Sequence, residues 1–309
     1  MVQSGKAITR HNTTARDATI TSRDNQWLKR FRAALSGERG DDGLLGLEGA
    51  RLVEAALGSG LRVEALLISD SGERHLARLS ASLFGGVQIL RTSDRLFAGV
   101  ADTQSPQGIA ALVRPAQTTI ENLSRGTALV VVLVGVQDPG NVGTILRAAE
   151  AFGATGAATC PVGSLGTADP LGPKALRASA GSALRLPILQ GLAMAGLMAK
   201  LRDSGIKIYA AVAAKKELQS DAPNSGPSFS APALLKPWEI NWKSPAAVLI
   251  GNEGAGLPEE IVRAADARVS IPRAAATTAV GVDSLNAAMA ATVLLYEAMR
   301  QRDAKSKNI

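Results

Sequence analysis

The first third of the chain alternates short apolar runs with polar and amphipathic stretches. Apolar segments at 44–47, 63–68, 87–90 and 109–113 predict strands, and Leu52, Val53, Ala56 and Leu57 predict a helix over residues 49–57 because they recur at helical spacing. This pattern is typical of a small α/β domain over residues 21–114. Polar residues 115–126 predict a linker, and residues 1–20 predict a disordered leader.

The rest of the chain predicts a second, larger α/β domain over residues 127–302. It opens with a continuous apolar run at 128–136, which is typical of a strand covered on both faces in a parallel sheet. Further strands are expected at 156–160, 206–212, 246–250 and 268–271, with helices between and after them. Ligands of such open sheets bind beyond the carboxyl ends of the strands. Five prolines predict a long surface loop over residues 214–245, and residues 303–309 are expected to fray.

The loop after the first strand of the second domain leads into an amphipathic helix. Pro139 and Gly140 predict a turn, and Asn141 predicts the helix N-cap. Arg147 lies about 140° from Val142 on the helix and therefore off the apolar stripe, free to face the strand end. Gly153 is expected to end the helix. The apolar stripe expected to be buried consists of Val142, Ile145, Leu146, Ala149 and Phe152.

Two further loops follow strands in the same way. Gly251, Gly254 and Gly256 follow the strand at 246–250, in a spacing that matches neither the dinucleotide nor the phosphate-loop fingerprint. After the last strand, residues 281–286 lead into a long helix that ends near Arg300, with Asp283 or Ser284 as the expected cap. This helix carries a stripe for packing or self-association, made of Leu285, Met289, Thr292, Tyr296 and Met299.

Composition narrows the function. A net charge of +7 and a pI of about 9.8 favour a polyanionic partner, whereas an aromatic content of 3% disfavours a binder that stacks single-stranded bases. The single cysteine, Cys160, excludes an internal disulfide and a zinc cluster, and we expect it to be buried. Neither histidine lies near a plausible serine nucleophile, so a Ser-His-Asp hydrolase is disfavoured. Chemistry is therefore expected to depend on Arg, Glu, Ser, Asn and main-chain groups, without a metal.

Localisation is expected to be cytoplasmic. No apolar run approaches the roughly 18–20 residues that cross a bilayer, and residues 1–20 lack the apolar core of a secretory signal. Their threonines and arginines resemble an organellar transit peptide faintly, and a cytosolic leader is the preferred interpretation.

Taken together, the three loops carry a family resemblance. Asn-Val-Gly-Thr-Ile-Leu-Arg at 141–147, Ile-Gly-Asn-Glu-Gly-Ala-Gly-Leu-Pro at 250–258, and Ile-Pro, Ser-Leu-Asn and Leu-Leu-Tyr-Glu between 271 and 297 occur in this order. They resemble the signature motifs of the SpoU (TrmH) family of RNA ribose 2′-O-methyltransferases, in the SPOUT superfamily, over about residues 128–302. A weaker likeness at 20–25, 47–53 and 107–109 resembles the substrate-binding domain that often precedes the catalytic domain.

The resemblance implies an α/β domain with a parallel sheet and a deep trefoil knot, which binds S-adenosylmethionine and forms a homodimer that acts on RNA. It implies that the cofactor is contacted by Ile250, Gly251, Ile271, Pro272, Leu285 and Asn286. It implies a polar catalytic set of Asn141, Arg147, Glu253, Ser284 and Asn286. One departure is that Arg273 replaces the family's commoner methionine and residues 273–283 enlarge the loop between Ile-Pro and Ser-Leu-Asn.

The expected reaction is in-line attack of a ribose 2′-oxygen on the methyl donor. A guanidinium pKa of about 12.5 or more disfavours Arg147 as a base, so we interpret Arg147 as a donor that orients the hydroxyl or an adjacent phosphate and stabilises oxyanion character. Asn141 would fix Arg147 or the ribose, Glu253 would anchor its loop or hold an arginine, and Ser284 and Asn286 would shape the pocket.

Alternatives remain open at this point. One is an RNA-binding protein of the same fold without catalysis, and another is a SPOUT enzyme that methylates a base. A nicotinamide-dependent dehydrogenase is disfavoured because its glycine fingerprint is missing. Ribosomal RNA is favoured over transfer RNA as the substrate, because an N-terminal domain of this kind is common in ribosomal enzymes.

Overall fold

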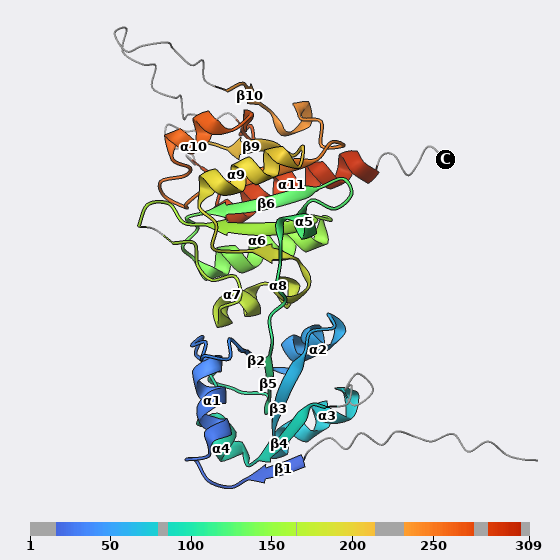
Figure 1. Cartoon of the computed structure of the whole chain (residues 1–309), viewed down its shortest axis with the longest axis vertical. Coiled ribbons are helices and arrows are strands. Elements are labelled where there is room, and N and C mark those ends of the chain that lie inside the picture. The colour runs from blue at the N-terminus through green and yellow to red at the C-terminus, as the bar shows by residue number, and fades with distance from the viewer. Residues whose placement is uncertain (1–16, 80–85, 165, 214–231, 275–283, 304–309) are drawn as a thin grey trace, which may run out of the picture. The chain divides into compact units, whose positions relative to one another are not determined.

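The computed structural model describes residues 17–79, 86–164, 166–213, 232–274 and 284–303, in two compact units, Met1–Pro115 and Ala116–Ile309. Each unit is built on its own β-sheet (Figure 1). The α/β fold class expected from the sequence is confirmed. Within the described residues, no helix is long and apolar enough to cross a membrane.

Unit 1 is a mixed five-stranded sheet in the order β1-β4-β3-β5-β2. β3 pairs in parallel with β4 and antiparallel with β5, and β2 pairs antiparallel with β5. The strands are β1 (Asp17–Ile20), β2 (Leu45–Glu48), β3 (Val63–Ser69), β4 (Gln88–Thr92) and β5 (Ile109–Val113). The helices are α1 (Gln26–Leu35), α2 (Ala50–Gly58), the 3-10 turn η1 (Asp70–Gly72), α3 (Glu73–Leu79) and α4 (Asp94–Ala98).

The expectation of a disordered leader is wrong for its last four residues. Asp17–Ile20 form β1, which pairs in parallel with β4, and Arg91 of β4 forms an ion pair with Asp17 at 2.7 Å. This strand is short and mostly exposed, so the sequence carries little apolar signal for it. Residues 1–16 lie outside the described residues.

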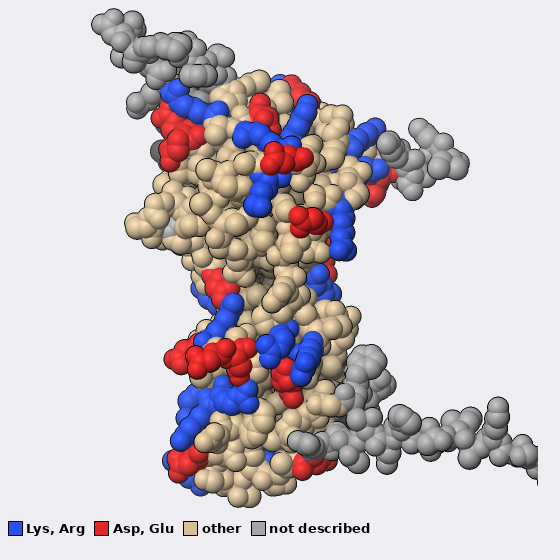
Figure 2. Space-filling view, viewed as in Figure 1, with Lys and Arg blue, Asp and Glu red and all other residues tan. Residues whose placement is uncertain are grey.

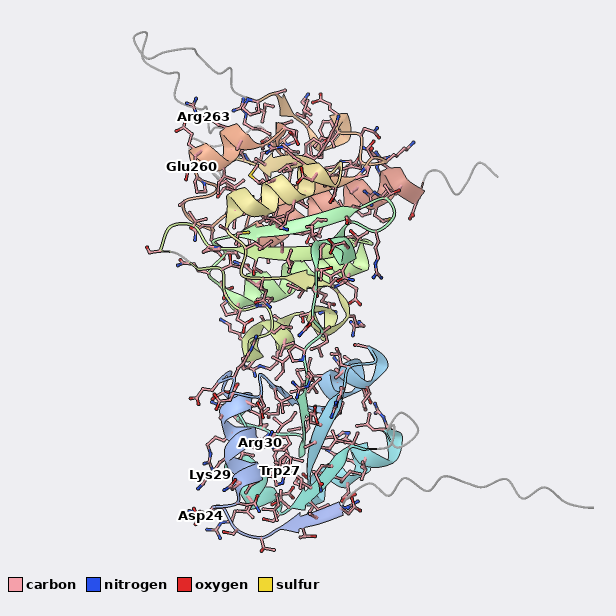
Figure 3. The ribbon with its side chains drawn as sticks, in the orientation of Figure 1. Asp24, Trp27, Lys29, Arg30, Glu260 and Arg263 are labelled. Atoms are coloured by element: carbon pink, nitrogen blue, oxygen red, sulfur yellow. The ribbon has the colours of Figure 1, made fainter. Side chains whose placement is uncertain are left out.

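Helix α1 gives unit 1 a partly basic surface. Figure 2 shows lysine and arginine side chains over this helix, with acidic side chains beside them, and Figure 3 labels Trp27, Lys29 and Arg30 along it. Arg30 lies over the Trp27 ring at 4.6 Å and pairs with Asp42 at 2.5 Å. Lys29 is exposed and forms no ion pair or hydrogen bond through its side chain with a described residue.

Unit 2 is a seven-stranded sheet in the order β10-β12-β9-β11-β6-β7-β8, and every pair in it is parallel. Its strands are β6 (Leu129–Val134), β7 (Gly156–Cys160), β8 (Ile188–Leu189), β9 (Lys207–Ala211), β10 (Leu234–Leu235), β11 (Ala246–Ile250) and β12 (Ala267–Val269). Its helices are α5 (Ile120–Leu123), α6 (Pro139–Ala151), α7 (Pro173–Ala178), α8 (Ser182–Arg185), α9 (Met194–Asp203), the 3-10 turn η3 (Pro237–Glu239), α10 (Glu259–Ala264) and α11 (Ala287–Asp303).

The central strands of unit 2 are buried along their whole length. Every residue of β6, β7 and β11 is buried, as the continuous apolar runs predict. The expected burial of Cys160 is also confirmed, and burial raises the pKa of its thiol to about 11. Within residues 115–126, expected as a linker, α5 buries Leu123 in the core of unit 2.

The long surface loop expected over residues 214–245 is wrong for its second half. Leu234–Leu235 form β10, which pairs with β12, and Trp242 is fully buried. The Trp242 indole N–H donates a hydrogen bond to the Pro237 carbonyl at 2.8 Å. The prolines here lie beside short turns that connect buried residues. A prediction from proline frequency therefore overestimates the length of the exposed loop. Residues 214–231 lie outside the described residues.

The amphipathic helix α6 carries the expected stripe. Val142, Ile145, Leu146 and Ala149 are buried, and Phe152 stacks edge-to-face on Tyr296 of α11, with ring centroids 5.8 Å apart. The helix ends at Ala151 with Phe152 as its C-cap, and Gly153 follows with a φ of +73°, which confirms the glycine expected just after the helix.

A close contact fixes the other side of α6. A Cβ on Gly143 would lie 2.4 Å from the Ala175 carbonyl oxygen and 2.6 Å from the Ala178 Cβ, so glycine lets α6 and α7 approach closely.

The trefoil knot stays a prediction. The family resemblance predicts that the loop after β11 and the loop between β12 and α11 form this knot. Residues 275–283 of the latter loop lie outside the described residues.

Candidate active site

The strand order places two of the predicted loops side by side. β6 and β11 are neighbours and run in parallel, so the loops at their carboxyl ends, 135–141 and 251–258, emerge at the same edge of the sheet. After β6 the chain continues towards β7 on one side, while β9 and β12 lie on the other side of β11. Ligands of open α/β sheets bind where the strand order changes direction in this way.

Helix α6 begins earlier than the sequence predicts. Its N-cap is Asp138, whose carboxylate accepts hydrogen bonds from the backbone N–H groups of Gly140 at 3.2 Å and Asn141 at 3.1 Å. Pro139 occupies the first helical turn, where its missing N–H costs nothing. The expectation that Asn141 caps the helix is therefore wrong, and its side chain is available for another contact.

That contact is a hydrogen-bond chain that joins all three motifs. Asn141 Nδ2 donates to Glu253 Oε1 at 3.0 Å, and Asn286 Nδ2 donates to Asn141 Oδ1 at 3.1 Å. Glu253 also accepts from the backbone N–H groups of Gln137 at 3.3 Å and Asp138 at 3.2 Å. Three expected catalytic residues are thus linked in one hydrogen-bond chain with Asn141 at its centre, although 145 positions separate Asn141 from Asn286.

The environment of Glu253 favours its charged form. Burial raises the pKa of this carboxyl, but the hydrogen bonds from Asn141 and from the backbone of Asp138 and Gln137 outweigh it and hold the pKa below its usual value. Glu253 is therefore an anchor that accepts hydrogen bonds at neutral pH. This arrangement fits the loop-anchoring role that the sequence predicts for it.

The loop after β11 is a tight turn held by its own backbone. Asn252 and Gly256 exchange two backbone hydrogen bonds, at 2.9 and 3.2 Å, and the Asn252 side chain accepts from the N–H groups of Gly254 and Ala255. Asn252 Nδ2 also donates to the Gly135 carbonyl at 3.0 Å, which ties this turn to the end of β6. The sequence analysis assigned Asn252 no role, although its position between two expected site residues, Gly251 and Glu253, indicates that it belongs to the site.

Gly251 lies where the turn is narrowest. A Cβ at this position would lie 2.4 Å from the Gly256 carbonyl carbon and 2.5 Å from the Leu257 nitrogen, closer than real side chains approach backbone. The turn therefore requires glycine at position 251.

A cavity of about 210 Å³ opens beside this turn. Six of the expected site residues line it, namely Ile250, Gly251, Glu253, Ile271, Ser284 and Leu285. The end of β9 and one face of α11 complete its wall through residues that sequence reasoning missed, namely Ala211, Val212, Ala213, Ala287, Ala290 and Leu294. Arg273, the departure from the family pattern, also lines it.

Two expected cofactor contacts do not line the cavity. Pro272 is exposed beside it, and Asn286 uses its side chain elsewhere. Asn286 Oδ1 accepts from the backbone N–H groups of Ala288 at 2.8 Å and Met289 at 3.3 Å, so it caps α11. The expectation that Ser284 caps this helix is wrong, and Asp283 lies outside the described residues.

Arg147 lies on α6, outside the cavity wall. Its side chain is exposed, as the helical geometry predicts, and forms no hydrogen bond or ion pair with any described residue. Lys174 of α7 reaches the same helix, with its Nζ 3.2 Å from the Asp138 carboxylate. Across the described ranges, no three potential ligands gather into a metal site.

The walls of the cavity are suited to a nucleoside-containing ligand. They combine apolar side chains with glycine-rich backbone that a flat ligand can approach closely, and the described lining residues include no lysine or cluster of basic groups that would indicate a polyphosphate. The fold and this cavity together define an α/β enzyme domain that binds a small organic cofactor at the carboxyl edge of a parallel sheet.

Comparison with known proteins identifies the class further. Residues 128–296 match the SpoU rRNA Methylase family, and residues 32–111 match the MRM3-like substrate binding domain. The chain belongs to the SpoU family and is an S-adenosylmethionine-dependent RNA methyltransferase.

Relatives and solved structures agree with this assignment. The chain is 31% identical to the 23S rRNA (guanosine(2553)-2′-O)-methyltransferase RlmP of Bacillus subtilis, over 81% of this chain and 86% of that protein. It is 33% identical to the 23S rRNA (uridine(2479)-2′-O)-methyltransferase of Streptomyces viridochromogenes, over 92% of each. The crystal structure of an AdoMet-bound rRNA methyltransferase from Sinorhizobium meliloti is similar, with a TM-score of 0.72 and 28% identity over 92% of this chain and 98% of that one.

Proposed function

We propose that this protein transfers the methyl group of S-adenosylmethionine to a ribose 2′-hydroxyl of ribosomal RNA in the cytoplasm. The main support is the link between the cavity and α6: Glu253 at the cavity wall binds Asn141, which lies six residues before Arg147 on this helix, and Arg147 has no side-chain partner among the described residues. Relatives that methylate the 2′-oxygen of 23S rRNA nucleotides support the same acceptor here. They act on different bases, guanosine and uridine, so the family leaves the target nucleotide open.

S-adenosylmethionine supplies a methyl group that is already activated by its sulfonium. The chain therefore needs to hold the cofactor and align the acceptor oxygen. Ile250, Gly251, Ile271 and Leu285 would hold the cofactor in the cavity. Ser284, which lies shortly before α11, lines the same cavity.

Arg147 would act on the acceptor. Its five N–H donors have no partner among the described residues, so they are available to a ribose oxygen or the neighbouring phosphate. There the guanidinium would stabilise negative charge as the 2′-hydroxyl loses its proton. Asn141 is held between Glu253 and Asn286, so we assign it the role of positioning the start of α6 rather than of fixing Arg147.

RNA binding would extend to unit 1. The match to a substrate-binding domain and the cations on α1 support RNA contacts through this helix; they include Lys29, whose side chain has no partner among the described residues. Phosphate contacts of this kind make affinity fall with salt concentration.

A methyl-transfer assay with radiolabelled cofactor tests the substrate class. Undermethylated 23S rRNA, 16S rRNA and bulk transfer RNA are offered separately, and we expect incorporation into 23S rRNA, about one methyl group per molecule, as a 2′-O-methylnucleoside after digestion. Incorporation into transfer RNA alone would contradict the ribosomal assignment.

We also propose that the enzyme is a homodimer through the exposed face of α11. Met289 is 64% exposed, Tyr296 50% and Val293 41%, and these apolar side chains form a contiguous stripe with helical spacing. Sedimentation velocity is expected to give one species of twice the 31.8 kDa chain mass, and Met289→Glu is expected to shift it to the monomer. A wild-type monomer at micromolar concentration would contradict the proposal.

A further inference from the structure

The described wall of the cofactor cavity carries two charged side chains, Glu253 and Arg273. The rest of the described wall is glycine backbone and small or apolar side chains, with the polar Asn252 and Ser284. A charge beside apolar groups interacts more strongly with a ligand charge than it does in bulk water. The two charges therefore bear strongly on which ligand groups the cavity accepts.

The negative charge is already satisfied inside the protein. The Glu253 carboxylate accepts hydrogen bonds from Gln137, Asp138 and Asn141, and Asn252 Nδ2 lies 3.4 Å from it. The first three donors come from the β6–α6 side, and Asn252 comes from the turn after β11. Glu253 is thus held by several groups of the protein, whereas Arg273 lines the cavity and keeps a contact within the chain.

Arg273 lies at the point where the sequence departs from the family pattern that it resembles. It directly follows Ile271-Pro272, where the resembling family more commonly has methionine. It is half-buried at the cavity wall, in the same wall as Ile271 and Leu285. A methionine side chain of similar length could fill the same space, so the change to arginine adds charge and hydrogen-bond donors rather than bulk.

We propose that Arg273 binds the carboxylate of the methionine part of S-adenosylmethionine and makes the cavity selective for it. The inference rests on the use of this cofactor, whose one anionic group is that carboxylate. Guanidinium and carboxylate match in a two-pronged geometry that an ammonium or a neutral side chain does not reproduce. A guanidinium has five N–H donors, so Arg273 can bind the carboxylate while it keeps its contact within the chain.

The charges of the cofactor restrict the arrangement further. The sulfonium and the ammonium are both positive, so Arg273 disfavours them near its guanidinium and favours the carboxylate. Decarboxylated S-adenosylmethionine lacks that group but keeps the adenosine, the sulfonium and the amine. A cavity with Arg273 is therefore expected to reject it, whereas a cavity with methionine at position 273 is not.

Calorimetric titration of both cofactors into the full-length protein tests the proposal. Arg273→Met is expected to weaken S-adenosylmethionine roughly 10- to 100-fold, as loss of a charge-assisted hydrogen bond implies, and to leave the decarboxylated form unchanged or tighter. Arg273→Lys is expected to lie between, since it keeps the charge and loses the fork. Arg263→Met on α10 (Figure 3), which removes an arginine that pairs with Glu259 at 2.7 Å, is the matched control and is expected to bind as the wild type does.

Three results would overturn the proposal. They are an unchanged affinity of Arg273→Met for S-adenosylmethionine, an equal loss for both cofactors, and weaker RNA binding with intact cofactor binding. The last would assign Arg273 to the substrate. The proposed function is judged separately with the wild-type protein, which should methylate RNA whatever the outcome of these titrations.

Discussion

Arg147→Ala is expected to lower the turnover number roughly 10²- to 10³-fold, the usual cost of removing an electrostatic donor that acts on developing charge. Arg147 is exposed on α6, has no partner among the described residues and does not line the cofactor cavity. Its loss should therefore leave the fold and the dissociation constant of S-adenosylmethionine unchanged. Single-turnover methyl transfer, calorimetry and thermal unfolding measure the three quantities.

Two companion variants sharpen this prediction. Arg147→Lys keeps the charge but not the planar fork, so we expect it to recover little of the lost rate. Arg263→Ala on α10 controls for the loss of a surface arginine and should retain full activity. Near-normal turnover by Arg147→Ala would remove this residue from the mechanism.

Gly251→Ala is expected to damage the cofactor site through the backbone. The added methyl carbon would lie 2.4 Å from the Gly256 carbonyl carbon, so the two sides of the turn must separate. Overpacking of this kind typically costs roughly 1–3 kcal/mol, and a displaced turn should weaken S-adenosylmethionine binding about 10- to 100-fold. Thermal unfolding and calorimetry report the two effects.

Gly254→Ala is the matched control in the same turn. Its added carbon would meet the Asn252 Oδ1 at 3.7 Å, an ordinary contact, and its backbone angles suit other residues. We expect its unfolding temperature to equal that of the wild type. If Gly251→Ala binds the cofactor as well as Gly254→Ala does, the close approach at Gly251 is not what shapes the site.

The sequence predicts most of the elements that build the site, because their signals are local. The continuous apolar runs mark β6 and β11, and the spacing of Val142, Ile145 and Leu146 marks the buried face of α6. The same helical geometry places Arg147 on the exposed side. These features depend on residues only a few positions apart.

Errors occurred where two local signals compete. Asp138 and Asn141 are both good N-caps, and the deciding signal is Pro139, which favours the first helical position and so points to Asp138. Prolines between 232 and 245 suggest an open loop, but Trp242 is buried within it and fastens it to the sheet. In both cases a neighbouring residue, Pro139 or Trp242, indicates the structure that is observed.

The hydrogen-bond chain of the site is beyond local patterns altogether. Asn286 reaches Asn141 and Asn141 reaches Glu253 across 145 and 112 positions of sequence. Strand pairing decides these distances, and a single sequence does not specify the order of strands in a sheet. Resemblance to a family brought these residues together as a set, whereas their partners became visible in the structure.

A ribose 2′-oxygen as methyl acceptor is tested by methyl transfer to a target RNA fragment, once the modified nucleotide is mapped, compared with the same fragment that carries a single 2′-deoxynucleotide at that position. We expect full transfer to the ribose form and none to the deoxy form, with equal RNA binding by both. Equal methylation of the two fragments would show that the acceptor is a base atom and not the 2′-oxygen.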